Sequence, residues 1–485
     1  MRFRALIREI VVRRTVSRKE VILSLIICLA ALGFLMLAAY RGFSVILVAP
    51  IAALGAVLLT DPAAVAPVFT GLFMDKMVGF VKLYFPVFLL GAVFGKVIEI
   101  SGFSQSIVSS VIRLVGSSRA MLSIVLVCAV LTYGGVSLFV VVFAVYPFAA
   151  ELFRQSDIPK RLIPGTIALG AFSFTMDSLP GTPQIQNIIP TTFFKTDTWA
   201  APVLGTIGSL FILVSGLAYL DWRRRVAARA GEGYGTGHSN EPEVMAKEKL
   251  VNPVVAILPL FAVGIFNRLL TDAIPGAYGA TAEVTLTPGA HPISQAVPAV
   301  AAIWAVEGAL LIGILLVVAT AFRQVAGRFA EGSKSAVAGA LLAAMNTASE
   351  YGFGAVIAAL PGFVTISNGL QSIPNPLVNE AVSVTALAGI TGSASGGMSI
   401  ALAAMSDKFI AAGQAAHIPM EVLHRVASMA SGGMDTLPHN GAVITLLAVT
   451  GLTHRQSYKD IFAVTCLKTA AVFVAILTYY LTGLV

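Results

Sequence analysis

The sequence predicts an all-α polytopic membrane protein made of two inverted-topology repeats, each with a re-entrant hairpin and a broken transmembrane helix. Hydrophobic residues account for 57% of the 485 residues and charged residues for 12%, with a mean hydropathy of +0.87. A soluble chain has about a quarter of its residues charged. The other two observations are apolar runs of about 20 residues, the length that crosses a bilayer, and short strings that recur in the second half of the chain.

The charged residues and cysteines argue against several other classes of protein. The net charge is +8, but most Lys and Arg residues stand at the ends of apolar runs, where they orient a membrane protein, so no nucleic-acid partner is predicted. Cys28, Cys128 and Cys466 lie in apolar stretches without metal-ligand spacing, which argues against disulfides and a zinc site. The sequence contains no catalytic motif, cofactor fingerprint or phosphate-binding loop, so we predict neither an enzyme nor a cofactor.

The chain begins with a basic N-terminal extension, residues 1–20, which contains seven Lys or Arg residues. The apolar run from Val21 to Ala39 is long enough to span a bilayer and lacks a small-residue cleavage site, so we expect a transmembrane helix there rather than a signal peptide. Further spanning helices are expected at about 43–60, 82–99, 199–220, 251–270, 297–322, 338–359 and 464–483.

Residues 221–250 predict a cytoplasmic linker between the repeats, which then cover residues 21–220 and 251–485. The linker is polar and Gly-rich and contains six Lys or Arg residues. The loop at 271–295 has no Lys or Arg, whereas the loop at 323–334 has three. The positive-inside rule therefore places the linker and the 323–334 loop in the cytoplasm.

The basic extension conflicts with this orientation. Each repeat contains an odd number of spans, so a cytoplasmic linker places residue 1 outside, whereas its basic residues favour the inside. Either an extra segment such as 64–80 crosses the membrane or the extension is atypical, and the sequence leaves both open.

A duplication is indicated by four short strings that recur in the same order, each roughly 260 positions later. The clearest is MDSLP at Met176–Pro180, which returns as MDTLP at Met434–Pro438. Inverted repeats of this kind are common in secondary transporters. The other strings are GGVS at 134–137 with GGMS at 396–399, IP at 158–159 with 418–419, and FGKVI at 94–98 with FGAVI at 353–357.

Broken helices are expected at about 162–193 and 421–451. In the first, the string PGTP at 180–183 interrupts the hydrogen-bond ladder near the middle of the membrane, and Thr182 is the expected N-cap of the next helical piece. The second repeats the interruption at Pro438. Unwound backbone at this depth is tolerated only inside protein or beside a water-filled cavity, so both breaks predict a site.

Re-entrant hairpins are expected before each break, at about 119–150 and 377–412, because Gly-rich tips join arms too short to span. Tips and breaks would meet at mid-membrane, where clustered N–H groups and hydroxyls suit a small carboxylate. The alternative is that the small residues serve only close helix packing. The expected substrate-binding residues are Gly134, Gly135, Ser137, Thr182, Ser393, Ser395, Gly396, Gly397, Ser399, Thr436, His439 and Asn440.

These segments resemble the gluconate permease (GntP) family of the ion transporter superfamily. The resemblance is strongest at FTMDSLPGTPQIQNIIPT (174–191), MDTLPHNGAVITLL (434–447) and FGKVIEISG (94–102), and it covers nearly the whole chain beyond about residue 21. It implies proton-coupled uptake of small hydroxycarboxylates such as gluconate or 3-hydroxybutyrate. It also implies elevator-type alternating access by a mobile transport domain on a homodimeric scaffold, in the bacterial cytoplasmic (inner) membrane.

The chain departs from true gluconate permeases at one motif. Those proteins have a His-Gly and a Pro-Pro-His-Pro-Gly-Pro stretch where this chain has DSLPGTP at 177–183. The sequence therefore looks closer to the hydroxybutyrate or citrate-like branch of the family.

Asp177, Asp435 and Glu350 are the candidate ion-coupling residues. An ionised carboxylate at the centre of a membrane helix costs ~2.5–3.5 kcal/mol on insertion scales, and desolvation favours its protonated form, so these groups suit proton transfer. The alternative is that the two Asp residues cap broken helices and Glu350 anchors two helices. Unwound carbonyls could also hold Na⁺, which leaves a sodium-coupled symporter open, and an ion antiporter or a channel is a more distant alternative.

Overall fold

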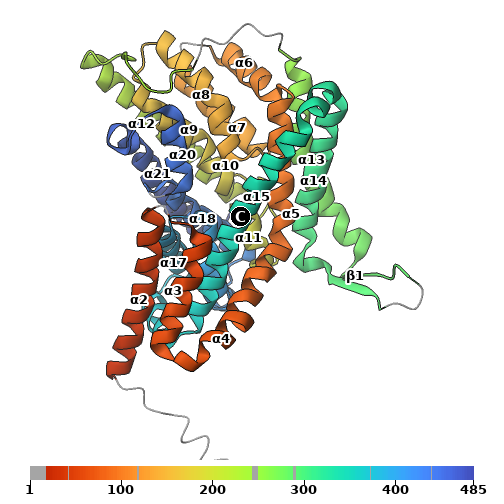
Figure 1. Cartoon of the computed structure of the whole chain (residues 1–485), viewed down its shortest axis with the longest axis vertical. Coiled ribbons are helices and arrows are strands. Elements are labelled where there is room, and N and C mark those ends of the chain that lie inside the picture. Colours follow the sequence, from red (N-terminus) through yellow and green to blue (C-terminus); the bar gives the residue numbers. More distant parts are fainter. Residues whose placement is uncertain are drawn as a thin grey trace, which may run out of the picture.

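The chain forms an almost entirely helical protein, as the sequence predicts (Figure 1). The structure, a computed structural model, describes residues 18–41, 43–116, 119–242, 250–287, 291–371, 373–438 and 440–485. Among these residues, five helical stretches are long and apolar enough to cross a membrane, so the protein is an integral membrane protein. They are Pro62–Ile100, Pro202–Arg229, Pro253–Tyr278, Ala301–Thr320 and His454–Thr482.

The described elements before the linker run in one series of helices. They are α2 (Arg18–Tyr40), α3 (Val45–Thr60), η1 (Pro62–Ala64), α4 (Val65–Pro67), the π-helical η2 (Val68–Phe73), α5 (Met74–Ile100), α6 (Phe103–Val115), α7 (Ala120–Tyr133), α8 (Leu138–Gln155), η4 (Lys160–Leu162), α9 (Ile163–Ala171), α10 (Phe174–Asp177), α11 (Ile185–Phe194) and α12 (Pro202–Arg229).

The elements after the linker include one small β-hairpin, in which Thr281 pairs with Ala296. They are α13 (Pro253–Tyr278), β1 (Thr281–Val284), β2 (Ile293–Ala296), η5 (Val297–Ala299), α14 (Ala301–Thr320), α15 (Phe322–Ala359), α16 (Pro361–Gln371), α17 (Pro376–Thr391), α18 (Ala394–Ala415), α19 (Met420–Gly432), η6 (Gly433–Thr436), α20 (Gly441–Thr450) and α21 (His454–Thr482).

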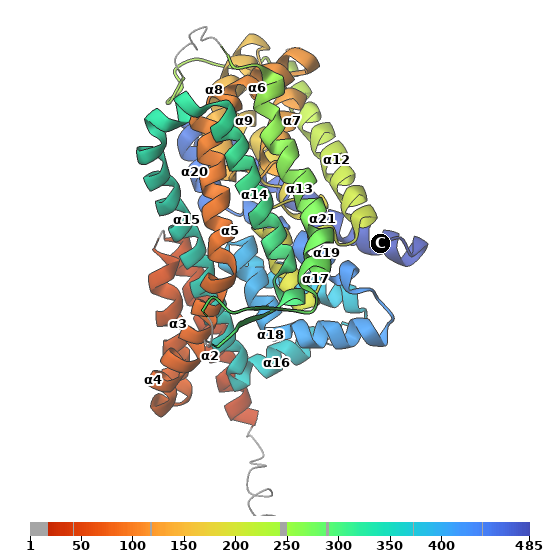
Figure 2. The same cartoon turned by 90° about the vertical axis from the view of Figure 1, so that its right-hand side faces the viewer.

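Two long helices, α5 and α15, lie side by side along the length of the molecule (Figures 1 and 2). The α13–α14 pair packs on α5 through α14, and α3 packs on α15. Gly352 of α15 has no Cβ where it faces Phe73 of η2, the segment just before α5, which lets α15 approach that segment closely. These helices form a wall against which the hairpins and broken helices pack.

Two helix pairs and two interrupted helices pack against this wall. α7 and α8 form one helix pair, joined at Gly134–Ser137, and α17 and α18 form another, joined at Gly392–Ser393. The helical path of α9 and α10 stops at Asp177 and resumes at Ile185 in α11. The path of α19 and η6 stops at Thr436 and resumes at Gly441 in α20.

The N-cap predicted for the first break is wrong. α11 begins at Ile185 with Gln184 at its N-cap position, and the Thr182 hydroxyl donates instead to the Thr175 carbonyl at 2.7 Å. Gln184 Nε2 donates to the Thr132 carbonyl at 2.8 Å, which ties the break to the tip of the α7–α8 hairpin.

Other predictions for the helices compare differently with the structure. α3 agrees with the predicted bounds of 43–60, but its 16 residues rise only about 24 Å, less than the ~30 Å of hydrocarbon that this segment was expected to cross. Residues 323–334 are not a loop, because α15 continues through them for 38 residues, about 57 Å. Segment 64–80 is not a separate span, because Pro62–Ile100 is one helical stretch of 39 residues.

The conflict over the N-terminus therefore persists in the structure. α2 begins at the end of the molecule opposite the linker (Figure 1). Because 64–80 adds no separate crossing, the start of α2 and the linker lie at opposite ends of the molecule.

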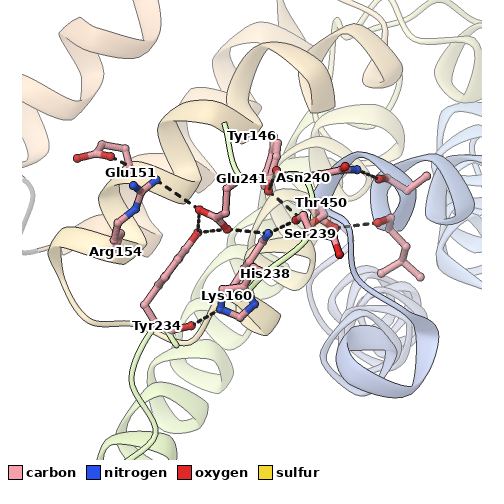
Figure 3. A network of polar contacts seen from close by, with 12 residues as sticks. Tyr146, Glu151, Arg154, Lys160, Tyr234, His238, Ser239, Asn240, Glu241 and Thr450 are labelled. Atoms are coloured by element: carbon pink, nitrogen blue, oxygen red, sulfur yellow. Dashed lines mark hydrogen bonds and ion pairs between the residues drawn. The ribbon is translucent and has the colours of Figure 1, made fainter. Parts of the chain in front are cut away.

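The linker begins later than the sequence indicates, because α12 continues to Arg229. Its described part lies across the ends of α8, η4 and α20 (Figure 3). Lys160, whose side chain is fully buried, donates to the Ser239 carbonyl at 2.7 Å and pairs with Glu241 at 2.8 Å. Asn240 accepts from the Tyr146 hydroxyl at 2.6 Å and donates to the Ala448 carbonyl at 2.9 Å. The linker thus binds helices from both halves of the chain.

Candidate functional site

The two helix breaks come together near the middle of the molecule (Figure 1), beside α21. α10 ends at Asp177, and η6 contains Asp435. A Cβ atom added at Gly432 would overlap the Asp177 carboxylate, and one added at Gly433 would come within 2.6 Å of the Thr469 hydroxyl of α21. Both breaks and α21 are therefore in direct contact, and only glycine fits at these two positions.

Asp435 is held by donors from three elements. Its Oδ2 accepts from Gln186 Nε2 of α11 at 3.0 Å, and its Oδ1 accepts from the backbone N–H of Ala394 at 3.0 Å and from Asn440 Nδ2 at 3.4 Å. Asn440 also donates to the Gly392 carbonyl at 2.8 Å. Asp435 remains partly exposed. The second hairpin tip, the second break and the first broken helix thus converge on one accessible carboxylate.

Asp177 lies at the end of the first broken piece and is only 2% exposed. Its backbone carbonyl accepts from the Ser428 hydroxyl at 2.7 Å and from Arg425 Nη1 at 3.1 Å. The fully buried Arg425 also donates to Asn187 Oδ1 at 3.0 Å and, from Nη2, to the Ala200 carbonyl at 2.7 Å. The hydrogen bonds of Arg425 hold the backbone of the break in place. Because the acceptors are neutral, they do not cancel the positive charge of Arg425, which remains beside Asp177.

Lys468 of α21 lies between the two breaks and is 1% exposed. Its Nζ donates to the carbonyl of Phe172, which follows the end of α9. The ammonium group interacts electrostatically with both Asp177 and Asp435, and the two carboxylates also interact with each other. The site therefore brings two carboxylates and one ammonium into the same buried region, where charges interact more strongly than in water.

Glu350 of α15 faces the tip of the α17–α18 hairpin and is 3% exposed. A Cβ atom added at Gly396 would overlap its carboxylate, and the Ser393 side chain lies close to it. Its Oε2 is buried and has no hydrogen-bond partner among the described residues. One turn earlier, the Thr347 hydroxyl lies 3.3 Å from that of Ser395. The wall helix and the hairpin tip thus meet on a polar surface next to Asp435.

The structure brings together only part of the predicted substrate site. Ser393, Ser395, Gly396 and Asn440 lie around Asp435 and Glu350, as described above. Gly397 instead packs against the backbone of α17 at Ala388, and the Ser399 hydroxyl donates to the Ser395 carbonyl at 2.7 Å. These last two residues stabilise the hairpin.

The predicted residues of the first hairpin contact the wall. A Cβ atom at Gly134 would collide with Leu260 of α13, and one at Gly135 would press on Leu310 of α14. The backbone N–H of Ser137 lies beside Gly95 of α5. The first tip therefore packs on α5, α13 and α14.

Two hydroxyls predicted to bind substrate form hydrogen bonds within the protein instead, and a third predicted residue lies outside the described part of the chain. The Thr182 hydroxyl bonds to Thr175, and that of Thr436 lies 2.6 Å from the Thr465 hydroxyl of α21. His439 lies outside the described residues.

Sequence reasoning missed Lys468, Arg425 and Gln186. Lys468 stands alone in an apolar run, and Arg425 lies in the second broken helix, so both carried a recognisable signal: a charge at membrane depth is rare and functional by default. Gln186 had no such signal, because only the tertiary contact with Asp435 distinguishes it. No group of three His, Cys, Asp or Glu side chains that could hold a metal ion occurs in the described part of the chain.

Comparison with known proteins identifies a near relative over almost the whole chain. It is 60% identical over 476 residues to "Uncharacterized transporter YxjC" of Bacillus subtilis (strain 168), a match that covers 96% of this chain and 100% of that protein. The YdaH transporter of Alcanivorax borkumensis, described as having an unusual topology, is 13% identical with a TM-score of 0.48, covering 87% of this chain and 90% of that one. No protein-family model matches the chain.

Proposed function

The chain belongs to the transporter family of YxjC, and from this premise we propose that it is a secondary active transporter that carries a small organic carboxylate together with protons. The observation that supports this proposal most directly is the cluster of Asp177, Asp435 and Lys468 at the meeting point of two broken helices. Broken helices at the middle of a membrane protein are where secondary transporters bind substrates and ions.

The donors around Asp435 favour an organic anion as substrate. Lys468 provides a buried positive charge, and the partly exposed hydroxyls of Ser393 and Ser395 lie at the hairpin tip. The hydrogen-bonding oxygen Oε1 of Gln186 is buried without a partner among the described residues, so the site retains an acceptor for a substrate hydroxyl. An ammonium, hydroxyls and an amide together match a small hydroxycarboxylate.

The carboxylates favour the proton as coupling ion. A buried carboxylate is stabilised in its protonated form by desolvation and by a neighbouring negative charge. When a substrate carboxylate enters beside Asp177 and Asp435, both effects increase, so substrate binding promotes protonation. Glu350, across the hairpin tip, is the third proton-coupling group that we propose.

The division into a wall and a set of hairpins supports an elevator mechanism. In this proposal α5 and α15, with α13 and α14, form the static scaffold, and the hairpins with the broken helices move as the transport unit. The proposal also includes that the two halves are inverted repeats, that the scaffold dimerises and that the protein resides in the bacterial cytoplasmic membrane. We propose that the substrate is of the kind carried by the hydroxybutyrate or citrate-like branch of the gluconate permease family.

The test is uptake into proteoliposomes that contain the purified protein. Radiolabelled hydroxycarboxylates are offered under an inward proton gradient, without a gradient, and with a sodium gradient in its place. The proposal expects accumulation driven by the proton gradient and insensitive to Na⁺. Accumulation driven by Na⁺ alone would identify the sodium-coupled alternative, and an absence of carboxylate uptake under all three conditions would overturn the proposal.

A double variant separates coupling from binding. Asp177→Asn/Asp435→Asn removes both central proton acceptors, so at a gradient of one pH unit the gradient-driven accumulation is expected to fall at least about tenfold, because each proton that is no longer coupled removes about 1.4 kcal/mol of driving force. Exchange of labelled for unlabelled substrate, which needs no net proton movement, is expected to persist. Unchanged accumulation would exclude both residues from coupling.

A further inference from the structure

The wall holds the first broken helix through hydrogen bonds from Tyr84 and Asn267. Tyr84 of α5 is 3% exposed, and its hydroxyl donates to the Thr192 hydroxyl of α11 at 2.9 Å. Asn267 of α13 is fully buried, and its Nδ2 donates to the Gly181 carbonyl at 3.0 Å and to the Thr198 hydroxyl at 3.1 Å. The first contact holds the helix that follows the break, and the second holds the break itself.

Aromatic side chains surround the Tyr84 contact. The Tyr84 ring lies 4.6 Å from that of Phe80, which in turn lies 5.6 Å from the ring of Tyr351 in α15. Phe193 of α11 meets Tyr351 edge-on, with the ring centroids 6.4 Å apart. Because the Tyr84 hydroxyl is buried in this contact between the wall and α11, bulk water does not replace a partner that it loses.

Asn267 binds a segment that the transport unit has already fixed. The backbone N–H of Gly181 donates to the Thr198 carbonyl at 2.8 Å, and Asn187 Nδ2 of α11 donates to the same carbonyl at 2.8 Å. Gly181 and Thr198 are therefore joined to each other and to α11 within the transport unit. Asn267 reaches this segment from α13, on the other side of the boundary between the wall and the unit.

Both contacts cross the boundary along which the proposed elevator moves. When the transport unit slides past the wall, the acceptors move and the two donors stay, so the same hydrogen bonds are not made in both end states. The net contribution of one intramolecular hydrogen bond corresponds to about a two- to twelvefold change in an equilibrium. Contacts that exist in one end state alone shift the populations by their own free energy.

On this basis we propose that Tyr84 and Asn267 are positioning residues that set the balance between the two end states of the transport cycle. Their hydrogen bonds stabilise the state described here and are absent from the other. The inference rests on the proposed function, specifically on movement of the transport unit against the wall, and it names wall residues that bias this movement without touching the substrate.

Two single variants remove the contacts separately. Tyr84→Phe removes one oxygen and keeps the ring, and Asn267→Ala removes the amide. Each is expected to raise the ratio of the other end state to the present one about two- to twelvefold. Thr192→Val removes the Tyr84 acceptor from the side of the transport unit and is expected to shift the ratio in the same direction. Tyr84→Phe combined with Thr192→Val is expected to add little to either single change, because both act on one hydrogen bond.

The ratio is measured as the populations of distances between two spin labels, by pulsed electron paramagnetic resonance on the full-length protein in lipid nanodiscs. One label is attached through Gly327→Cys of α15, and the other through Gln155→Cys of α8. Both positions are exposed, and a Cβ atom at Gly327 meets nothing within 4 Å. Cys28, Cys128 and Cys466 are replaced by alanine so that the labels attach only at these two positions.

Tyr146→Phe is the matched control. The buried Tyr146 of α8 donates its hydroxyl proton to the Asn240 carbonyl at 2.6 Å, and Asn240 is itself bonded to the Ala448 carbonyl of α20. This contact lies on the transport-unit side of the boundary, so its loss is expected to lower the melting temperature and to leave the ratio of end states unchanged.

Three results would overturn the inference. They are an unchanged ratio in the folded Tyr84→Phe and Thr192→Val variants, a change in Tyr146→Phe as large as theirs, and a single common distance in the wild type and every variant. Melting temperatures show which variants are folded. If Asn267→Ala does not fold, the pair of Tyr84→Phe and Thr192→Val decides, because each removes no more than a hydroxyl contact.

Carboxylate uptake by the same labelled proteins separates this inference from the proposed function. If the wild type takes up no carboxylate in proteoliposomes, the proposed function itself fails. If it accumulates carboxylate while the distance populations ignore Tyr84→Phe, only the role of the two wall residues fails.

Discussion

Gly396 and Glu350 show how a single missing side chain shapes the site. The glycine lies on α18, and any Cβ there would overlap the Glu350 carboxylate of the opposing wall helix. Glu350 is almost completely buried, so it has little room to move away. The hairpin tip can therefore lie against α15 only because residue 396 is glycine.

Gly396→Ala is expected to destabilise the protein by about 1–3 kcal/mol through overpacking and to reduce uptake. The measurement is thermal unfolding in detergent together with proteoliposome uptake. Gly396→Ala/Glu350→Ala is expected to recover much of the lost melting temperature, because the shortened side chain makes room. Gly55→Ala is the matched control, since a Cβ at Gly55 of α3 meets nothing within 4 Å. An equal loss in both single variants would contradict a steric origin.

At the scale of elements, Asn440 has two roles: it caps α20, and it links the second break to the hairpin tip. Its Oδ1 accepts from the Ala442 N–H at 2.7 Å and so caps α20, while its Nδ2 holds the Gly392 carbonyl of the hairpin tip. The same residue also donates to Asp435. A cap placed at the break thus fixes the tip and the carboxylate together.

Asn440→Ala is expected to lower stability by about 1 kcal/mol, the usual cost of a lost cap, and also to weaken substrate affinity. Asn252→Ala is the matched control, because Asn252 caps α13 by accepting from the Val254 N–H at 2.9 Å, away from the breaks. It is expected to show the stability loss alone. Substrate KM and melting temperature are measured for both, and a KM that is unchanged in Asn440→Ala would refute the second role.

At the scale of the whole molecule, the linker joins the two halves at one end. Arg161 donates to both oxygens of Glu232, at 2.6 and 2.7 Å, and also pairs with Asp460 of α21 at 3.3 Å. These hydrogen bonds hold the pKa of Glu232 below its ordinary value. The attraction of its carboxylate to Arg161 and Arg223 lowers the pKa further, whereas burial raises it by less than the hydrogen bonds lower it. The linker carboxylate therefore favours the folded state only while it is ionised.

The stabilising effect of Glu232 is expected to depend on pH. Because its pKa is lowered by folding, the effect is complete above the unfolded pKa of about 4.3 and is lost as pH falls through the lower folded value. Melting temperatures of the wild type and Glu232→Gln are compared from neutral to acid pH. The gap between them is expected to be small, since Glu232 is 42% exposed, to shrink in high salt and to close in acid. A gap that persists in acid would assign the effect to packing.

The sequence by itself determined the fold class and the positions of the interruptions. Apolar runs and their length dictate membrane helices, and the cluster of Pro180, Gly181 and Pro183, with Pro438 in the second copy, favours a break because it removes helical hydrogen bonds. A single proline is not enough, since Pro86 and Pro147 lie inside continuous helices. Asp177 and Asp435 were recognisable for a similar reason, since a charge in an apolar segment is costly in any fold. These are local properties of the chain.

Only the tertiary structure decided which predicted residues share a site. Gln186 binds Asp435 from 249 positions away, and Ser393, Ser395 and Asn440 join them, whereas Gly134 and Gly135 pack on the wall. The bounds of α15 and the N-cap at Gln184 were likewise set by contacts with other helices. Proximity between distant segments depends on the packing of whole helices, which local composition does not encode.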